Sequence, residues 1–226
     1  MNGVTLCITI GRRPDLLRQT LSALLQHAQF DAIIAINDFR DDETNQAFKN
    51  MCPDGHLISL DRHLGHHGAV DHMYGLVSTP WVFHCEDDWL FEKPIDLQKL
   101  IGVLKSDPSL SAICLRQRSD FYLKPEDDRK VRFESHGGLN FFRLDPVHDQ
   151  WHGYSFNPHL ASLDLWRSVG PFSKFKKERH ISRTIRKMGL TMPYWADGGC
   201  THLGANDSVS YPVVPKKPFW KRWLRL

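Results

Sequence analysis

The chain has 226 residues, of which 41% are hydrophobic, so it is long enough for one large domain or one domain with a small additional lobe. Its formal net charge of +3 is too small to favour nucleic-acid binding, and its five scattered cysteines lack a C-x-x-C pair, which argues against a disulfide framework or a structural zinc site. No apolar run reaches transmembrane length and the N-terminus lacks the layout of a signal peptide, so we expect a cytoplasmic protein.

The first half of the chain alternates apolar runs with amphipathic segments. Continuous apolar and β-branched runs predict strands at residues 4–10, 32–36, 57–60, 81–85 and 111–115. Helices are predicted after Pro14 and at residues 44–51, 66–77 and 97–105. Strands that alternate with helices in this way indicate an α/β fold with a parallel sheet and right-handed crossovers.

The pattern is looser in the second half of the chain. Residues 116–134 are charged and rich in turn residues, which predicts a loop or a small β excursion. Residues 151–160 mix aromatic side chains with Gly, Asn and Pro, which is more typical of a binding loop than of a core element. A helix is predicted at 177–188, ended by Gly189, and a late strand at 191–195.

Polar clusters follow three of the predicted strands, namely Gly11-Arg12-Arg13, Asn37-Asp38 and Glu86-Asp87-Asp88. Ligands of parallel sheets bind beyond the carboxyl ends of the strands, so we expect these clusters to converge on one rim. Three adjacent carboxylates repel one another, and a divalent cation that carries phosphate oxygens would offset this repulsion. An acidic turn in water is the simpler alternative, but the convergence favours a metal site.

These residues resemble the family 2-like glycosyltransferases, which have the nucleotide-sugar-binding GT-A fold. The matching segments are Gly11-Arg12-Arg13-Pro14 after the first strand, the acidic loop at 36–42, the Gly-rich helix start at 64–71, and Glu86-Asp87-Asp88 in place of the family's D-x-D motif. The glutamate-first form of this motif is similar to that of N-acetylglucosaminyltransferases that act on glycoprotein mannose.

The resemblance implies a Rossmann-like, mostly parallel sheet flanked by helices. It implies a single GT-A-like domain over residues 1–215, with a nucleotide-sugar-binding half at 1–115. A smaller, loop-rich acceptor-binding half would follow at 116–215. The implied activity is transfer of a hexosyl or N-acetylhexosaminyl group from a nucleoside diphosphate sugar, with UDP expected, to a glycan, lipid-linked or surface-polysaccharide acceptor. We expect the transfer to be inverting.

Several residue roles in donor binding follow from the resemblance. Asp38 would accept a hydrogen bond from the base, unless it only caps a turn. Glu86 and Asp87 would contact the ribose, and Asp88 would hold Mn²⁺ or Mg²⁺ on the diphosphate. His202, in a Thr-His-Leu-Gly segment, is the second candidate metal ligand, and a loop histidine bonded to backbone is the alternative.

Gly11, Arg13 and His67 complete the predicted nucleotide-sugar site. The histidines around residues 63–72 do not have the spacing of a standard zinc site, and a role facing phosphate at a helix N-terminus suits His67 better.

An inverting transferase needs a carboxylate that deprotonates the acceptor hydroxyl. The resemblance assigns this role to Glu178 at the start of the predicted helix, although the family's acid is often followed by a second Asp, whereas Arg179 and His180 follow here. Stabilisation of a helix N-terminus by Glu178 is the alternative. Asp149 is the rival base, and a retaining reaction would need neither. Trp151 and Tyr154 are the predicted acceptor-binding residues, because aromatic faces stack on sugar C–H surfaces.

The basic and aromatic residues of 216–226 favour peripheral contact with an anionic membrane. Docking on the protein's own surface and disorder are the alternatives. Two other functions also stay open. One is a sugar-phosphate nucleotidyltransferase, although the expected Gly-rich lead and lysine are absent; the other is a non-catalytic carbohydrate- or partner-binding module on a degenerate transferase fold.

Overall fold

A computed structural model describes residues 2–203 of the chain, so the predicted basic tail at 216–226 lies outside the described residues. The strands are β1 (Val4–Ile10), β2 (Ala32–Asn37), β3 (His56–Ser59), β4 (Trp81–Glu86), β5 (Trp89–Phe91), β6 (Ala112–Cys114), β7 (Arg132–His136), β8 (Leu139–Arg143), β9 (His159–Ser162), β10 (Tyr194–Trp195) and β11 (Cys200–His202). The helices are α1 (Pro14–His27), α2 (Asp42–Met51), α3 (His66–Tyr74), α4 (Leu97–Ser106), α5 (Pro125–Asp128), α6 (Leu163–Val169) and α7 (Glu178–Lys187). Short 3₁₀ turns occupy Arg118–Asp120 and Phe172–Lys174.

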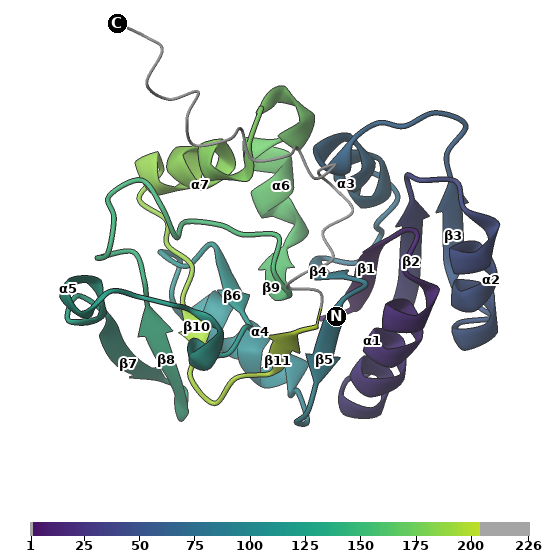
Figure 1. Ribbon diagram of the computed structural model, residues 1–226. Coiled ribbons are helices and arrows are strands. Elements are labelled where there is room, and N and C mark those ends of the chain that lie inside the picture. Colours follow the sequence, from purple (N-terminus) through teal and green to yellow (C-terminus); the bar gives the residue numbers. More distant parts are fainter. Residues whose placement is uncertain (1, 204–226) are drawn as a thin grey trace, which may run out of the picture.

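One large sheet runs through both halves of the chain (Figure 1). Within residues 2–203 it contains nine strands in the order β3-β2-β1-β4-β9-β6-β10-β8-β7. The strands β3, β2, β1 and β4 are mutually parallel, as predicted. β9 runs antiparallel between β4 and β6, and the β7–β8 hairpin forms one edge. The fold is therefore the predicted α/β type with a mostly parallel central sheet.

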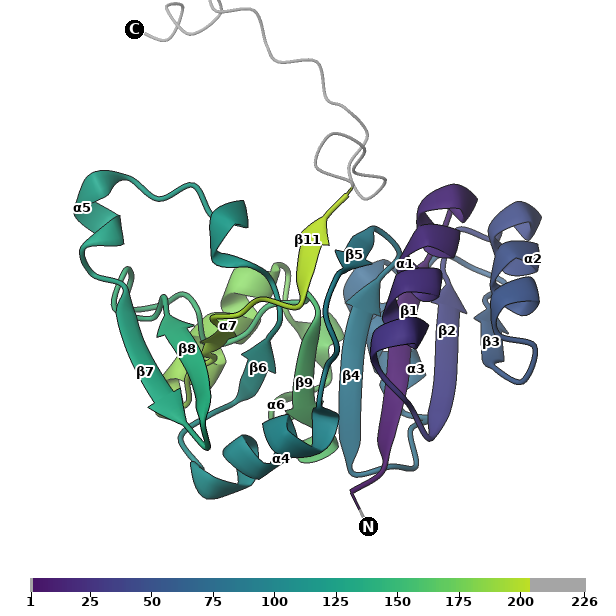
Figure 2. The ribbon, with the colours of Figure 1, turned by 90° about the horizontal axis from the view of Figure 1, so that it is seen from below.

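Helices cover both faces of this sheet, as Figure 2 shows. Alternate residues of β1 point to opposite faces, so that Leu6 and Ile8 belong to one apolar core and Cys7 to the other. Helices α1, α2 and α4 pack into the first core, and α3, α6 and α7 into the second. All five cysteines are buried and free, and three of them, Cys7, Cys85 and Cys114, lie in apolar runs of the sequence. None of the helices within the described part of the chain combines the length and the apolar character needed to cross a bilayer.

The second half contains more regular structure than the sequence predicts. The segment expected to be a loop or small β excursion at 116–134 leads into a hairpin whose turn is Gly137-Gly138, with φ of 57° and 71°. Glycine adopts these positive angles without strain, which suits a two-residue hairpin. The predicted binding loop at 151–160 ends in strand β9, whose His159 is fully buried.

Asp71 links helix α3 to the segment that follows α6. Its carboxylate accepts hydrogen bonds from Trp166 Nε1 at 2.8 Å and from the backbone N–H groups of Phe172 and Ser173, both at 2.7 Å. The start of the second 3₁₀ segment is therefore held by a single side chain of α3.

We predict that Asp71→Ala lowers the free energy of unfolding by about 2–4 kcal/mol, because three donors lose a charged acceptor. Asp164→Ala is the matched control, since Asp164 is exposed on α6 and, among residues 2–203, its carboxylate pairs only with Arg167. It should change the same quantity by less than about 1 kcal/mol. Urea unfolding measures both values, and similar losses in the two variants would contradict the assignment.

Candidate active site

Three carboxylates lie where strand β4 ends and strand β5 begins. Asp87 and Asp88 are only 1% and 5% exposed. Burial raises the pKa of Glu86 to about 8, and the charges of Asp88, Glu178 and Asp87 add to this effect. Burial also raises the pKa of Asp87 to about 6, against the opposing charge of Arg13. The cluster is thus a buried anionic site that favours a cation.

Arg13, at the start of α1, supplies positive charge to this cluster. Its guanidinium donates to Asp87 Oδ1 and, at 2.5 Å, to Asp88 Oδ2. The other oxygen of Asp87 accepts the backbone N–H of Gly11 at 3.0 Å. A side chain at Gly11 is excluded, because its Cβ would lie 2.1 Å from the ring of Phe39. The turn after β1 therefore approaches the acids closely, through both backbone and side chain.

Strand β11 brings His202 to Asp88, although 114 positions separate them in the chain. β11 pairs antiparallel with β5 so that His202 lies opposite Trp89, and His202 Nε2 is 3.1 Å from Asp88 Oδ2. Burial acts to raise the pKa of Asp88, but the hydrogen bond from His202 and the charge of Arg13 outweigh it and hold that pKa below its usual value. The backbone N–H of His202 donates to Asp120 Oδ2 at 3.1 Å, which anchors the strand.

Asp88 and His202 fit a divalent metal ion as a partial ligand set. Asp88 Oδ1 is buried and accepts no hydrogen bond from the described residues, and such an oxygen calls for a cation or a donor. Carboxylate oxygen and imidazole nitrogen are both suitable ligands for Mn²⁺. Within residues 2–203 no group of three His, Cys, Asp or Glu side chains forms a complete set. The remaining ligands would have to be water and phosphate oxygens, as is usual for magnesium-type ions.

A cavity of about 90 Å³ lies beside the acids at the carboxyl ends of β1 and β2. Asp38 lines it, and its two oxygens accept the backbone N–H groups of Leu64 at 2.6 Å and Gly65 at 2.8 Å. Asp38 therefore fixes the loop that leads into α3. Its Oδ2 also lies 2.8 Å from His63 Nδ1, whereas Oδ1 keeps a lone pair for a further donor. The cavity is also lined by the side chains of Phe39, Arg13 and Glu86.

His66, rather than the predicted His67, lines this cavity. His67 is not among the residues that line the cavity, and its Nδ1 lies 2.8 Å from the backbone oxygen of Phe175. Behind His66 lies a buried histidine pair, formed by His84 of β4 and His159 of β9. These two residues are opposite each other in the sheet, and their rings stack with centroids 5.2 Å apart.

A second cavity, of about 310 Å³, lies between helix α7 and the segment that precedes β9. Both predicted acceptor-binding residues, Trp151 and Tyr154, line it. Trp151 is 45% exposed, whereas Tyr154 is only 3% exposed and packs edge-on against Phe156. Trp151 stacks on His148, with ring centroids 4.4 Å apart, and keeps part of its ring exposed, while the ring of Tyr154 is largely used by the core.

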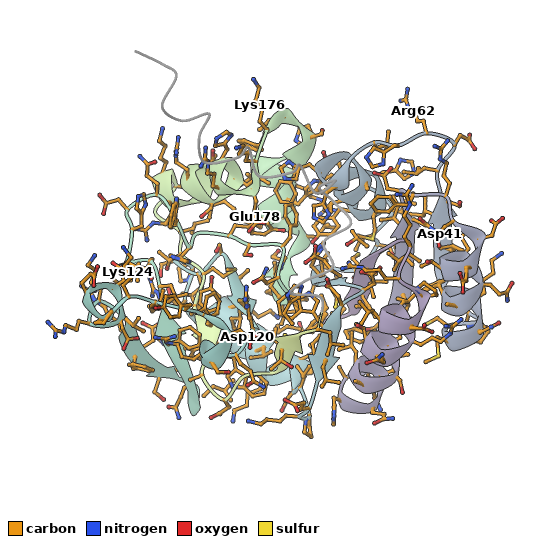
Figure 3. All side chains as sticks on the ribbon, viewed as in Figure 1. Asp41, Arg62, Asp120, Lys124, Lys176 and Glu178 are labelled. Carbon is orange, nitrogen blue, oxygen red and sulfur yellow. The ribbon has the colours of Figure 1, made fainter. Side chains whose placement is uncertain are left out.

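Glu178, the first residue of α7, also lines this second cavity. Burial raises its pKa, although the carboxylate accepts hydrogen bonds from the hydroxyl of Ser155 and the backbone N–H of Phe156. Figure 3 shows Glu178 beneath α7, toward the interior of the molecule. Its charge contributes to the raised pKa of Glu86, so the carboxylates of the two cavities are close enough to interact.

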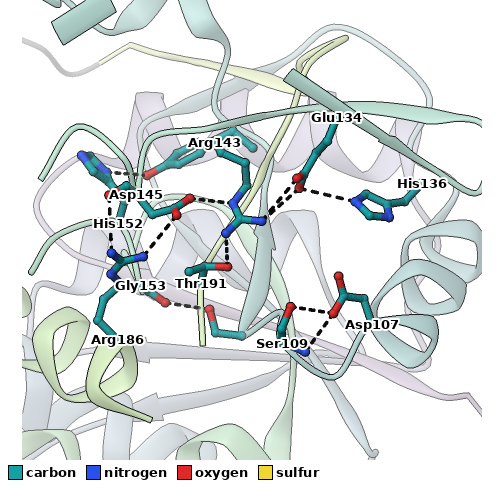
Figure 4. A network of polar contacts seen from close by, with 12 residues as sticks. Asp107, Ser109, Glu134, His136, Arg143, Asp145, His152, Gly153, Arg186 and Thr191 are labelled. Atoms are coloured by element: carbon teal, nitrogen blue, oxygen red, sulfur yellow. Dashed lines mark hydrogen bonds and ion pairs between the residues drawn. The ribbon is translucent and has the colours of Figure 1, made fainter. Parts of the chain in front are cut away.

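Asp149, the other predicted base, is exposed and is not among the residues that line this cavity. Its backbone oxygen accepts a hydrogen bond from Arg186 Nε at 3.1 Å. Figure 4 shows the surrounding network, in which Arg143 Nε lies 2.6 Å from Asp145 Oδ1 and Arg186 lies 3.2 Å from Asp145 Oδ2. These ion pairs tie the loop that carries Trp151 to the helix that begins with Glu178.

Two residues of the site, Arg116 and Asp120, were missed by the sequence prediction. Arg116 lines the second cavity, donates to Asn157 Oδ1 at 3.0 Å, and lies 4.5 Å from the ring centre of Phe121. Asp120 holds the backbone of His202. Both lie in a charged, turn-rich segment in which single residues carry no recognisable spacing.

Comparison with known proteins identifies the family and the fold of the chain. The sequence profile described as glycosyl transferase family 2 matches residues 5–160. No curated protein sequence gives a significant match. Structures with a similar fold include the mannosyltransferase PcManGT from Pyrobaculum calidifontis in complex with GDP-Man and Mn²⁺, with 14% identity and a TM-score of 0.63. Another is GalNAc-T7 with UDP, GalNAc and Mn²⁺, with 10% identity and a TM-score of 0.64. A third is S. aureus TarS 1-349, with 9% identity and a TM-score of 0.59.

The chain spans only part of each of these larger proteins. The three alignments cover 91%, 96% and 88% of this chain but 58%, 45% and 59% of PcManGT, GalNAc-T7 and TarS, respectively. At these identities the likeness establishes the fold.

We predict that the contribution of the buried histidines His66 and His159 to stability falls as the pH drops from about 6.5 to 4. Burial lowers the pKa of His159 to about 4, and burial with the charge of His67 lowers that of His66 to about 4. The folded chain thus keeps these rings neutral, whereas the unfolded chain takes up protons below about pH 6.5. The associated stability is complete above that pH and declines toward pH 4, by up to about 3 kcal/mol for each ring.

Urea unfolding at a series of pH values tests this prediction with His159→Gln. The variant should be less stable at neutral pH, because a packed ring is lost, but its stability should fall less steeply in acid. Parallel pH profiles for the variant and the unsubstituted chain would contradict the role given to His159.

Proposed function

Because this chain belongs to glycosyl transferase family 2, we propose that it transfers a sugar from a nucleoside diphosphate sugar, with a UDP-sugar as the expected donor, to an acceptor hydroxyl. The observation that supports this most directly is the contact between Asp88 and His202 beside the cavity at the carboxyl ends of β1 and β2. Ligands of parallel α/β sheets bind at this edge. The Mn²⁺ and nucleotide ligands named for PcManGT and GalNAc-T7 support a metal-dependent reaction on the same fold.

The first cavity would hold the nucleoside part of the donor. Asp38 Oδ1 has a lone pair that can accept an N–H of the base, and the ring of Phe39 offers a face for stacking. Glu86 would bind the ribose as a hydrogen-bond donor, because its raised pKa favours the protonated carboxyl group. Asp87 would contact the same sugar. His66, which lines the cavity, would face the donor in place of the predicted His67.

Asp88 and His202 would hold Mn²⁺ or Mg²⁺, which when bound offsets negative charge on the leaving diphosphate. Arg13 and the backbone of Gly11 approach the same acids, so Arg13 would add a second positive charge near the phosphates. In this arrangement the Arg13 guanidinium and the metal ion would both be present, and the guanidinium would not replace the ion.

Glu178 would act as the base of an inverting transfer. Burial raises its pKa above that of a free glutamate and so makes its carboxylate a stronger base, which suits removal of a proton from the acceptor hydroxyl. Trp151 would bind the acceptor sugar on its exposed face. The acceptor class that fits is a glycan, a lipid-linked sugar or a surface polysaccharide, with a hexosyl or N-acetylhexosaminyl group transferred.

We expect a UDP-sugar with Mn²⁺ to raise the melting temperature. Saturation at a hundred times Kd would stabilise the chain by about 2.7 kcal/mol. Asp88→Asn should abolish the part of the shift that depends on Mn²⁺, because a metal ligand loses its charge. Asp61→Asn, on an exposed residue of the loop after β3, is the control and should keep the full shift.

A panel of UDP- and GDP-sugars identifies the base in the same assay. The absence of a shift with every donor and metal would count against the proposal. Release of pyrophosphate from a nucleoside triphosphate and a sugar phosphate would identify a nucleotidyltransferase instead.

Glu178→Gln should lower kcat about 10²–10⁴-fold in transfer or donor hydrolysis, while the thermal shift with donor and Mn²⁺ remains. Asp149→Asn is the matched control and should leave kcat within about twofold, because Asp149 is exposed outside the second cavity. A large loss in Asp149→Asn with a small loss in Glu178→Gln would reverse the assignment of the base. Loss of both donor binding and activity in Glu178→Gln would point to a structural role.

A further inference from the structure

Helix α7 and the residues just before it carry a strong concentration of positive charge. Residues 174–187 include one acid, Glu178, and seven cations, which are Lys174, Lys176, Lys177, Arg179, Arg183, Arg186 and Lys187. The formal charge of this short segment is therefore +6, twice that of the whole chain. Such a concentration creates a local electrostatic potential that attracts anions.

Most of these cations face solvent. Lys176, Lys177, Arg179 and Lys187 are exposed, and within residues 2–203 none of the four forms an ion pair. Arg186 differs, because it pairs with Asp145 and holds the neighbouring loop. Figure 3 shows Lys176 at the outer edge of the molecule, pointing away from the body, whereas Glu178 lies beneath the helix. At the start of α7 the acidic side chain of Glu178 thus points inward, whereas the neighbouring basic side chains are exposed to solvent.

Exposed apolar side chains lie next to these cations. Met188 follows the last residue of α7 and is 47% exposed. Trp151, 45% exposed, belongs to the loop that Arg186 binds, and it lines the second cavity together with Arg179. Lysine, arginine and tryptophan side chains together are typical of proteins that contact lipid headgroups.

We propose that this α7 surface, which consists of Lys176, Lys177, Arg179, Arg183, Lys187, Trp151 and Met188, rests on an anionic lipid bilayer. The cations of this α7 surface are spread along the helix, and among them only Arg179 lines the second cavity. This distribution fits contact with an extended anionic surface rather than with a small ligand in the cavity. A soluble polyanion would satisfy the cations but would leave Met188 and Trp151 in water. Membrane contact at α7 would place the opening of that cavity at the headgroups, where a lipid-linked acceptor would be presented; this consequence rests on the proposed function, whereas the contact itself does not.

Vesicle sedimentation with the full chain tests the contact in the absence of any sugar donor. Vesicles containing about one-third phosphatidylglycerol should bind the chain, and neutral phosphatidylcholine vesicles should not. Each cation near such a surface contributes roughly fivefold to affinity. The triple variant Lys176→Glu, Lys177→Glu, Lys187→Glu should therefore bind on the order of 100-fold more weakly, and raised salt should weaken the unsubstituted chain.

Two control variants make the same change of charge elsewhere. Lys49→Glu, Lys99→Glu, Lys124→Glu alters exposed residues of other elements and should keep most of the binding. Lys216→Glu, Lys217→Glu, Lys221→Glu alters the basic tail, which the sequence predicted to contact a membrane. Equal losses in the α7 and first control variants would overturn the proposal, as would complete dependence on the tail.

Two further readouts separate the alternatives. Brominated lipids should quench part of the tryptophan fluorescence, and Trp151→Phe should remove that part. Stronger binding to soluble polyphosphate than to anionic vesicles would overturn the membrane assignment in favour of a polymeric anion. Vesicle binding without any donor-dependent thermal shift would leave the membrane contact in place and reject the proposed enzymatic function.

Discussion

The burial of Asp87 and Asp88 is the constraint on which the site depends. Two carboxylates removed from water at the end of a sheet would be strongly unfavourable without a nearby cation. The guanidinium of Arg13 contacts both, and His202 contacts the same Asp88 oxygen as Arg13. Because these residues come from the turn after β1, the β4–β5 connection and β11, the need to compensate the acids holds three distant segments together. The preference for a further cation at Asp88 follows from the same charge balance.

The sequence was most informative where one physical signal determined one structural feature. The strands β1, β2 and β4 are continuous apolar runs because both of their faces are covered by helices, so their positions and parallel order were predictable. Polar residues directly after such strands must lie at one edge of the sheet. The sequence pattern therefore predicts the position of Asp38 and of the Glu86-Asp87-Asp88 cluster at that edge. It could not show that Asp38 also fixes the backbone at Leu64 and Gly65.

Other features depend on information that residue patterns do not carry. A rotation of about 100° per residue decides which histidine of α3 faces the cavity, and the phase of a short helix cannot be read from its sequence. The short strand β9 begins with His159, whose burial depends on stacking against His84 in another strand. By contrast, the Gly137-Gly138 turn was a recognisable hairpin signal that the prediction did not use. Arg116 and Asp120 acquire their roles only through contacts with residues distant in sequence.

The position of His202 has a consequence for how the protein matures. Asp88 and its neighbours in β4 leave the ribosome long before residue 202, so the partner of Asp88 is absent while the first half of the chain collapses. Pairing of β11 with β5 closes a long loop, and such non-local steps are slow relative to helix formation. The Asp88–His202 contact is therefore acquired late in synthesis. A nascent chain that has already folded its first strands and helices would contain Asp88 but would still lack His202, the second proposed metal ligand.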